Sequence, residues 1–344
     1  MSPTALFMII LGITVSTLTV MSANHWLTAW LGLELNMISI LPMITKHKHP
    51  RATEAATKYF LTQAIASALM LFSSTLNAWQ TGSWDITQLN NEMSCILMVS
   101  ALTMKMGAAP AHFWLPEVLQ GSTMAIALLM TTWQKIAPIT LLYTISNHIQ
   151  SNIVLYIGLL SILVGGWGGI NQTQLRKMMA YSSISHLGWT MAVISITPNI
   201  ALTNIIIYMT MSTPLFLLLM STSSKTLQTT TTTWIHAPAA TIMMMLLLLS
   251  MAGLPPLTGF TPKLLILDKL VAHKLTITAM AMALTSLLSL VFYLRTMYLL
   301  ASTTPPITTQ STTLWRLKPR QNQMTTVLIP IALFNITILP ALLT

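Results

Sequence analysis

The chain has 344 residues, of which 54% are apolar and only 6% are charged, and its formal net charge is +10. Because an ordinary soluble protein has about 25% charged residues, this composition excludes a soluble enzyme and predicts an integral membrane protein. We assign the positive charge to topology signals in loops rather than to nucleic acid binding, and the single cysteine, Cys95, excludes an internal disulfide and a cysteine-ligated cluster.

Apolar runs near the spanning length recur along the whole chain, so we expect an all-α, polytopic membrane protein with a single transmembrane domain over residues 1–344. The runs predict about eleven transmembrane helices. We place them at residues 3–22, 25–44, 57–79, 93–119, 123–146, 150–170, 178–197, 200–222, 238–268, 274–300 and 325–343. No basic signal-peptide region or Arg-rich leader precedes the first run, so we expect this helix to be retained.

The basic residues of the loops predict the orientation. With the N-terminus inside, the inner side holds most of them: Lys46, Lys48, Arg51, Lys58, Arg176, Lys177, Lys225, Arg316, Lys318 and Arg320. The outer loops hold Lys269 and Lys274, together with Asp85 and Glu92. This asymmetry agrees with the positive-inside rule and with an odd number of helices, which places the termini on opposite sides.

Glu34 lies in the middle of the apolar segment Trp26 to Ile38. A carboxylate there needs a buried partner, and the cations that fall outside the loops are lysines: Lys105, Lys135 and Lys263. We interpret Glu34 as a proton-carrying group that works with a lysine, and a purely structural ion pair is the alternative.

Lys105 stands in the apolar stretch Val99 to Pro116. A lysine at the centre of a spanning helix costs roughly 2.5–3.5 kcal/mol, so such a residue usually faces a bundle interior and marks an ion or proton path. Pro110 cannot donate to the carbonyl of Met106, which predicts a helix break beside the ammonium. His112 follows this break, either as a proton-carrying group or as an ordinary hydrogen-bonded histidine.

Two further polar positions are candidates for the same path. Lys135 precedes Pro138, which removes the usual donor to the carbonyl of Gln134, so ammonium and backbone could share a water. His186 lies in the predicted helix 178–197 on a polar face with Tyr181, Ser182 and Ser185. This face suits a proton relay, and an ordinary hydrogen-bonded histidine is the alternative.

A second interrupted segment runs from Ser250 to Lys263 and contains several glycines and prolines. The breaks fall in the fourth and ninth predicted helices, five helices apart. This spacing predicts two five-helix repeats at 1–148 and 149–300, of which the second is inverted. A loop and a C-terminal helix follow at 301–344. Lys105 precedes its break and Lys263 follows its own. We therefore expect Lys105 at the C-terminal end of a half-helix, where the dipole favours a cation, and Lys263 at an N-terminal end, where the dipole disfavours it. The alternative for Lys263 is that its side chain snorkels to the membrane interface.

Other local patterns predict structure rather than chemistry. Gly165 and Gly169 have the GxxxG spacing of close helix packing, and the run Thr229 to Thr233 predicts a loop. The chain has no P-loop, dinucleotide-binding glycine pattern or nucleophile elbow, and we predict no metal site.

Four stretches carry a resemblance to a known family: Trp30 to Asn36, Lys105 to Gln120, Tyr181 to Trp189 and Gly253 to Lys263. From Met1 to Thr344 the chain resembles the antiporter-like membrane-arm subunits of mitochondrial respiratory complex I, the proton-translocating NADH:ubiquinone oxidoreductase. Its richness in Met and Thr and its near absence of Cys are similar to those of a mitochondrially encoded product.

The resemblance implies an antiporter-like protein of the mitochondrial inner membrane, with the N-terminus on the matrix side and the C-terminus on the intermembrane-space side. It implies that Glu34 and Lys105 form the family's glutamate–lysine pair, that Lys135 links two half-channels and that Lys263 leads toward the outlet. His186 and His112 fit the same axis. Protons would move from the matrix to the intermembrane space, coupled to quinone reduction elsewhere in the complex.

The resemblance also implies that NADH, FMN, iron–sulfur clusters and ubiquinone are bound by other subunits, so this chain would be a non-redox subunit without a cofactor. Its partners would be other membrane-arm subunits, including the neighbouring antiporter-like subunit, and phospholipids such as cardiolipin. Two alternatives remain open from the residues. The chain could be an autonomous cation/proton antiporter, which needs the same breaks and lysines, or a scaffold whose buried charges only fix packing.

Overall fold

The computed structural model describes residues 2–46, 49–89, 91–302 and 323–334, and over these ranges it is helical, without a β-strand. Several residues used in the topology argument lie outside the described ranges, namely Lys48, Arg316, Lys318 and Arg320, as does the end of the helix predicted at 325–343. For the described residues, the all-helical class predicted from composition and apolar run length is confirmed.

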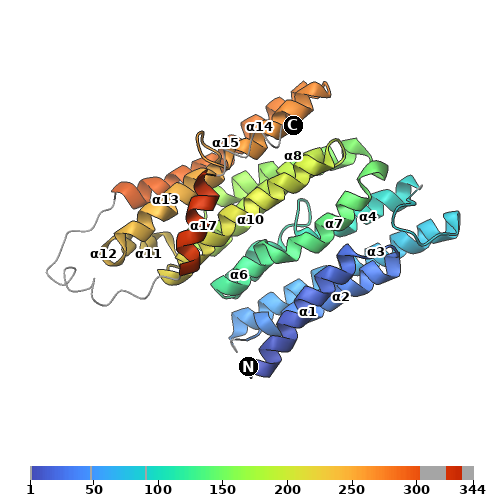
Figure 1. Cartoon of the computed structure of the whole chain (residues 1–344), viewed down its shortest axis with the longest axis horizontal. Coiled ribbons are helices and arrows are strands. Elements are labelled where there is room, and N and C mark those ends of the chain that lie inside the picture. The colour runs from blue at the N-terminus through green and yellow to red at the C-terminus, as the bar shows by residue number, and fades with distance from the viewer. Residues whose placement is uncertain (1, 47–48, 90, 303–322, 335–344) are drawn as a thin grey trace. The chain divides into compact units, whose positions relative to one another are not determined.

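Contacts divide the chain into two units, unit 1 (Met1–Ser161 and Met191–Pro198) and unit 2 (Ile162–Thr190 and Asn199–Thr344). Unit 1 contains α1 (Pro3–Met21), α2 (Trp26–Ile44), α3 (Pro50–Thr81), α4 (Glu92–Met106), α5 (Trp114–Gly121), α6 (Met124–Thr131), the 3₁₀ turn η1 (Trp133–Lys135), α7 (Ile136–Thr144) and η2 (Ser146–His148). Both α8 (Ser151–Ile170) and α9 (Leu175–Ile194) have residues in each unit. Unit 2 contains α10 (Pro198–Ser221) from its second residue on, together with α11 (Leu227–Thr231), α12 (Thr233–His236), α13 (Pro238–Ala252), α14 (Phe260–Ala272), α15 (Thr276–Ser302) and α17 (Gln323–Phe334) (Figure 1).

Seven stretches of the described chain are long and apolar enough to cross a membrane, which makes this a multi-pass membrane protein by length and composition. They are α1, α2, α3, the stretch Met124–Thr144, α8, α10 and α15. The other four predicted segments also contain helices. Two of these are interrupted, as α4 with α5 and α13 with α14, while α9 is more polar and α17 is described over only 12 residues.

Helix α3 begins earlier than the sequence predicts, at Pro50 rather than at residue 57. His49 is its N-cap, and the Nδ1 of His49 accepts a hydrogen bond from the amide of Arg51 at 3.2 Å. Pro50 occupies the first helical position, where a missing N–H costs nothing. The earlier start places Arg51, which the charge pattern assigns to an inner loop, in the first turn of this helix.

Helices α1 and α2 of unit 1 pack closely along their length (Figure 1). A Cβ at Gly12 would lie 2.5 Å from the Oγ of Ser39, and one at Gly32 would lie 2.6 Å from a methyl group of Val20. Small residues at such positions let helix backbones approach, which is how membrane helices gain packing contacts without a hydrophobic driving force.

Glycines of α8 serve two different neighbours in unit 2. A Cβ at Gly165 would lie 2.7 Å from the backbone nitrogen of Ser185 on α9, whereas one at Gly169 would lie 2.7 Å from the ring of Phe292 on α15. The prediction of close packing is therefore confirmed, but the two glycines of the GxxxG spacing do not serve the same helix.

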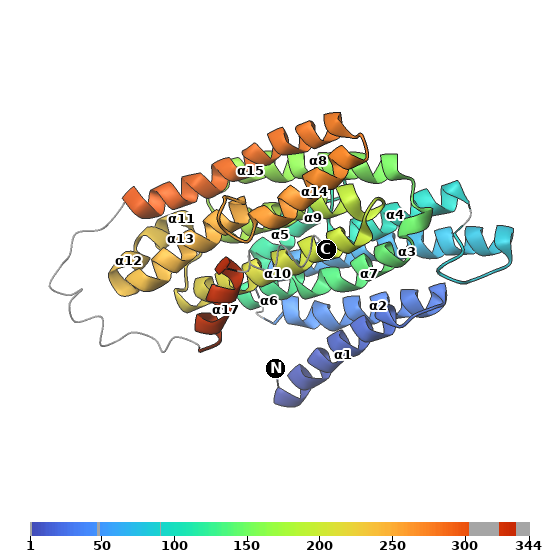
Figure 2. The same cartoon turned by 45° about the horizontal axis from the view of Figure 1, so that its top comes forward.

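The threonine run predicted as a loop is partly helical. Leu227–Thr231 forms α11, because Thr226 and Thr229 build a capping box in which the Oγ1 of Thr226 accepts from the amide of Thr229. The Oγ1 of Thr229 in turn accepts from the amide of Thr226 at 3.0 Å. Reciprocal capping satisfies the first orphan donors of even a short helix. Figure 2 shows α11 and α12 beside the first residues of α13.

Candidate functional site

Lys105 lies in the last turn of α4, where the helix stops within unit 1. The stop is made by Gly107, whose φ of +77° is the left-handed conformation that favours glycine at a helix C-terminus. The amide of Gly107 donates to the carbonyl of Thr103 at 3.0 Å. The predicted break is present, but it begins three residues before Pro110, because the left-handed glycine ends the hydrogen-bond ladder first.

A cavity of about 20 Å³ adjoins Lys105 in unit 1. Lys105 is only 6% exposed, and its Nζ has no hydrogen-bond partner among the described residues. The polar side chains that line the cavity are Asn36, Tyr59, Gln63, Lys105, Gln134 and Lys135. A cavity of this size has room for about one water, and a buried ammonium with free donors is the kind of group that such a water satisfies.

Neighbouring side chains hold the freed backbone at the α4 break. The Nε2 of Gln63 on α3 donates to the carbonyl of Lys105 at 3.2 Å, and the indole Nε1 of Trp114 on α5 donates to the carbonyl of Met104 at 3.2 Å. Broken helices persist in membranes only where other groups satisfy the freed carbonyls. Gln63 and Trp114 therefore stabilise the interruption beside the lysine.

Lys135 reaches the same cavity from a second interruption that the sequence argument does not place. The chain leaves α-helical geometry at Thr132, whose Oγ1 donates to the carbonyl of Leu128, and continues as the 3₁₀ turn η1 before α7. Lys135 is 2% exposed. The Nε2 of Gln134 donates to the Oδ1 of Asn36 on α2 at 2.9 Å, which ties this turn to the helix that carries Glu34. Two of the predicted lysines thus line one small polar cavity.

Glu34 on α2 is partly exposed. The ion pairs found among the described residues do not include it, since both of them belong to Lys58. Among the described residues, Glu34 and Lys105 therefore do not form a direct ion pair.

His112 lies in the loop between α4 and α5 and is 6% exposed. Its Nδ1 is 3.1 Å from the carbonyl oxygen of Pro110, and its ring lies 4.2 Å from that of Phe113. His112 is not among the residues that line the Lys105 cavity.

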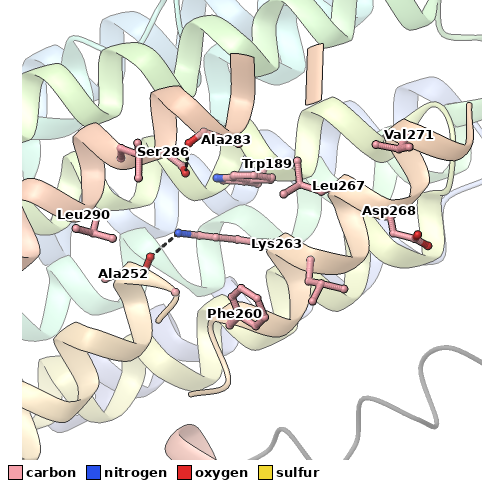
Figure 3. Close-up of a pocket in the computed structure, with 13 residues that line it drawn as sticks. Trp189, Ala252, Phe260, Lys263, Leu267, Asp268, Val271, Ala283, Ser286 and Leu290 are labelled. Carbon is pink, nitrogen blue, oxygen red and sulfur yellow. Dashed lines mark hydrogen bonds between the residues drawn. The ribbon is translucent and has the colours of Figure 1, made fainter. Parts of the chain in front are cut away.

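Lys263 lies in the first turns of α14, beyond the second break, in unit 2. Helix α13 ends at Gly253, whose φ is +82°, and the Nζ of Lys263 donates to the carbonyl of Ala252 at 2.7 Å (Figure 3). The ammonium also lies 6.0 Å from the ring centroid of Trp189 on α9, in cation–π range. It borders a pocket of about 480 Å³ that is mostly apolar.

His186 is buried on α9, also in unit 2. Its ring centroid lies 4.9 Å from that of Tyr208, and the Nδ2 of Asn204 donates to its backbone carbonyl at 3.4 Å. The expected polar face is present, but the hydroxyls of Ser182 and Ser185 donate to carbonyls of their own helix. The structure thus brings Lys105 together with Lys135, while Lys263 and His186 belong to unit 2.

Sequence reasoning missed several polar residues around the first cavity. Asn36 and Gln63 are buried amides within otherwise apolar spans, which is a signal that could have found them. Lys58 and Glu117 form an ion pair at 2.5 Å between α3 and α5. No local pattern connects these two residues, because they lie far apart in the chain and each resembles an isolated loop charge.

Comparisons with known proteins agree with this arrangement. Residues 23–289 match the family described as NADH:quinone oxidoreductase/Mrp antiporter, TM. The chain is 51% identical over 340 residues to NADH-ubiquinone oxidoreductase chain 2 of Varanus melinus, covering 99% of this chain and 98% of the relative. It is 47% identical to the protein of the same name from Xenopus laevis, over all of both chains.

Solved structures show the same fold. A chain of respiratory complex I from Thermus thermophilus matches with a TM-score of 0.79 at 23% identity, over 98% of this chain and 80% of that one. A chain of the Mrp complex from Dietzia sp. DQ12-45-1b also matches with a TM-score of 0.79, at 17% identity, over 87% of this chain and 61% of that one. The predicted antiporter-like fold is therefore confirmed, and the chain belongs to the NADH:quinone oxidoreductase/Mrp antiporter transmembrane family.

Proposed function

We propose that this chain is a proton-translocating, non-redox membrane subunit of NADH:ubiquinone oxidoreductase. The observation that carries the proposal is the water-sized cavity of unit 1, which two buried lysines, Lys105 and Lys135, line at interrupted helices. Full-length similarity to proteins named NADH-ubiquinone oxidoreductase chain 2 supports the same assignment. Buried ionisable residues at helix breaks are typical of ion and proton paths in membranes.

In the proposed mechanism, a proton passes from the ammonium of one lysine to the neutral amine of the other by way of water in the cavity. Lys105 donates to that water, and Lys135 exchanges a proton with it from the opposite interruption. In this scheme the carboxylate of Glu34 would stabilise the ammonium form of Lys105, so a change in the position of Glu34 would alter how readily Lys105 releases its proton. In this scheme Gln63 and the Gln134–Asn36 pair keep the two lysines in place.

The remaining candidates extend the path. Lys263, whose ammonium borders the larger pocket of unit 2, would serve the outlet side, and His186 would act as a relay on α9. His112, beside the α4 break, would exchange protons near Lys105. The two five-helix repeats at residues 1–148 and 149–300 stay a prediction about how these parts are related.

We place the chain in the mitochondrial inner membrane, with its N-terminus on the matrix side, as part of a hetero-oligomeric complex. Other subunits would bind NADH, FMN, iron–sulfur clusters and ubiquinone. The surface partners would be a neighbouring antiporter-like subunit and phospholipids such as cardiolipin. The many exposed apolar side chains of the spanning helices, such as Phe7, Phe72 and Ile277, support contacts with lipid or with other membrane subunits.

The test is proton pumping and NADH:quinone turnover by reconstituted complex that carries Lys105→Met. Methionine keeps the apolar length of lysine, so the cavity is not enlarged. We expect the complex to assemble and pumping to fall, because the cavity loses its proton carrier. The control is Lys105→Arg, which keeps the positive charge and so separates the effect of losing the charge from the effect of losing the lysine. Normal pumping in Lys105→Met would reject the proposal and favour a structural role for the buried charge.

An autonomous cation/proton antiporter is not favoured, because the relatives that match the whole chain carry the name of an oxidoreductase subunit. Purification separates the two functions. A subunit is expected to be unstable and inactive outside its assembly, whereas an antiporter would exchange cations for protons as an isolated chain in vesicles.

A further inference from the structure

Lys58 joins the two helices that form one wall of the Lys105 cavity. Its Nζ lies 2.5 Å from the Oε1 of Glu54, one turn earlier on α3, and 2.5 Å from the Oε2 of Glu117 on α5. The contact with Glu54 stays within α3, whereas the contact with Glu117 bridges α3 and α5. Only the second contact can therefore fix the distance between the two helices.

The bridge lies between the first turn of α3 and the cavity. Gly121, at the end of α5, packs on the backbone of Arg51 near the start of α3, where an added Cβ would lie 2.6 Å from the carbonyl oxygen. At the other end of α5, the ring of Trp114 lies 5.6 Å from that of Tyr59, and both residues line the cavity. The Lys58–Glu117 ion pair adds a polar contact between α3 and α5, in the part of α3 that lies between Arg51 and Tyr59.

The chemistry of this contact differs from that of the packed contacts around it. The side chains are partly exposed, 39% for Lys58, 60% for Glu54 and 49% for Glu117, so water competes for the ammonium. Exposed ion pairs shift an equilibrium by a factor of only about 1.5 to 5, and Glu54 offers Lys58 a second partner when Glu117 moves away. The bridge can therefore open and close at small cost.

We propose that the Lys58–Glu117 ion pair is a clasp that holds α5 against α3 and limits access of water and protons to the Lys105 cavity from the N-terminal end of α3. The clasp acts by position, since neither residue lines the cavity. When it opens, the α5 residue Trp114 moves away from Tyr59 and the wall of the cavity parts. The inference rests on the proposed function, because it takes Lys105 as the proton carrier.

The test compares Glu117→Gln with Glu54→Gln in assembled complex reconstituted in vesicles. Both variants remove one carboxylate from the same ammonium, but only Glu117→Gln releases α5. We expect Glu117→Gln to raise the passive proton leak about two- to fivefold, with fewer protons pumped per NADH oxidised and unchanged NADH oxidation. Glu54→Gln should leave the leak at the wild-type value. Equal leaks in the two variants would overturn the clasp.

Two further variants keep the result unambiguous. Lys58→Arg can still bridge both carboxylates and should keep the low leak, whereas Lys58→Gln should leak like Glu117→Gln. Adding Lys105→Met to Glu117→Gln should return the leak to its basal value if the path runs through the cavity, and a persistent leak would contradict that route. The single variant Lys105→Met separates the two proposals. Normal pumping in this variant would reject the proposed function. If only the clasp is wrong, Lys105→Met should still pump poorly, while Glu117→Gln and Glu54→Gln show equal leaks.

Discussion

The ammonium of Lys263 lies near a different helix end from the one at which its backbone stands. Its place at the start of α14 predicts that the helix dipole disfavours its charge. The side chain instead reaches back across the break, and its ammonium donates to the last residue of α13, Ala252. The ammonium of Lys263 therefore lies at the C-terminus of α13, where a dipole favours a cation, and the contrast expected between the two lysines stays a prediction without this support.

This contact predicts the result of Lys263→Met. The carbonyl of Ala252 loses its donor, and an unsatisfied buried acceptor costs about 1–3 kcal/mol, so we expect a lower thermal unfolding temperature of the assembled complex. Lys263→Arg keeps donors within reach and serves as the control. Equal unfolding temperatures of the wild type and Lys263→Met would show that this hydrogen bond does not stabilise the α13 end.

The two broken helices, α4 with α5 and α13 with α14, are interrupted in the same way. Each first half-helix ends at a glycine with positive φ, Gly107 after α4 and Gly253 after α13, with a lysine close to the turn. The prolines that the sequence argument uses lie farther along the loop. Sequence thus predicts the presence of both breaks, because several helix breakers cluster there, but not where the helices stop.

Gly107→Ala tests whether the turn matters beyond its backbone strain. A Cβ at Gly107 would meet Leu115 at 2.8 Å and the ring of Trp114 at 3.2 Å, whereas a Cβ at Gly82, whose φ is +71°, would meet nothing within 4 Å. Both alanine variants should lose about 1–2 kcal/mol of stability from the left-handed backbone. Only Gly107→Ala should also lower pumping, because it displaces Trp114 from the cavity. Similar pumping in the two variants would mean that the site tolerates this shift.

Over the described residues, composition and apolar run length are enough to predict the all-helical membrane class and the approximate places of the helices, but not their ends. They succeed because the bilayer imposes one spanning length on every segment. Part of the site could also be predicted, since a buried lysine such as Lys105 or Lys135 is rare in an apolar run. The Lys58–Glu117 bridge could not be, because it depends on tertiary contacts between distant segments.

The proposed orientation can be tested with single reporter cysteines. The native Cys95 is buried and should not react with a polar thiol reagent. We expect Lys225→Cys, in the exposed loop after α10, to be labelled only from the matrix side, and Lys274→Cys, in the exposed loop before α15, only from the opposite side. The reason is that the broken helix of α13 and α14 lies between them in the chain. Labelling of both from one side would contradict the topology.

The 3₁₀ turn at Trp133–Lys135 also changes the direction in which the side chains of the following helix, α7, point around the helix axis. Each residue of a 3₁₀ turn advances by about 120° around the axis, against about 100° in an α-helix, so three such residues rotate the continuation by about 60°. Within the turn, Lys135 is 2% exposed while Trp133, two residues earlier, is 38% exposed. A helical wheel drawn through residues 124–144 as one regular helix therefore misplaces the residues of α7 by about 60°.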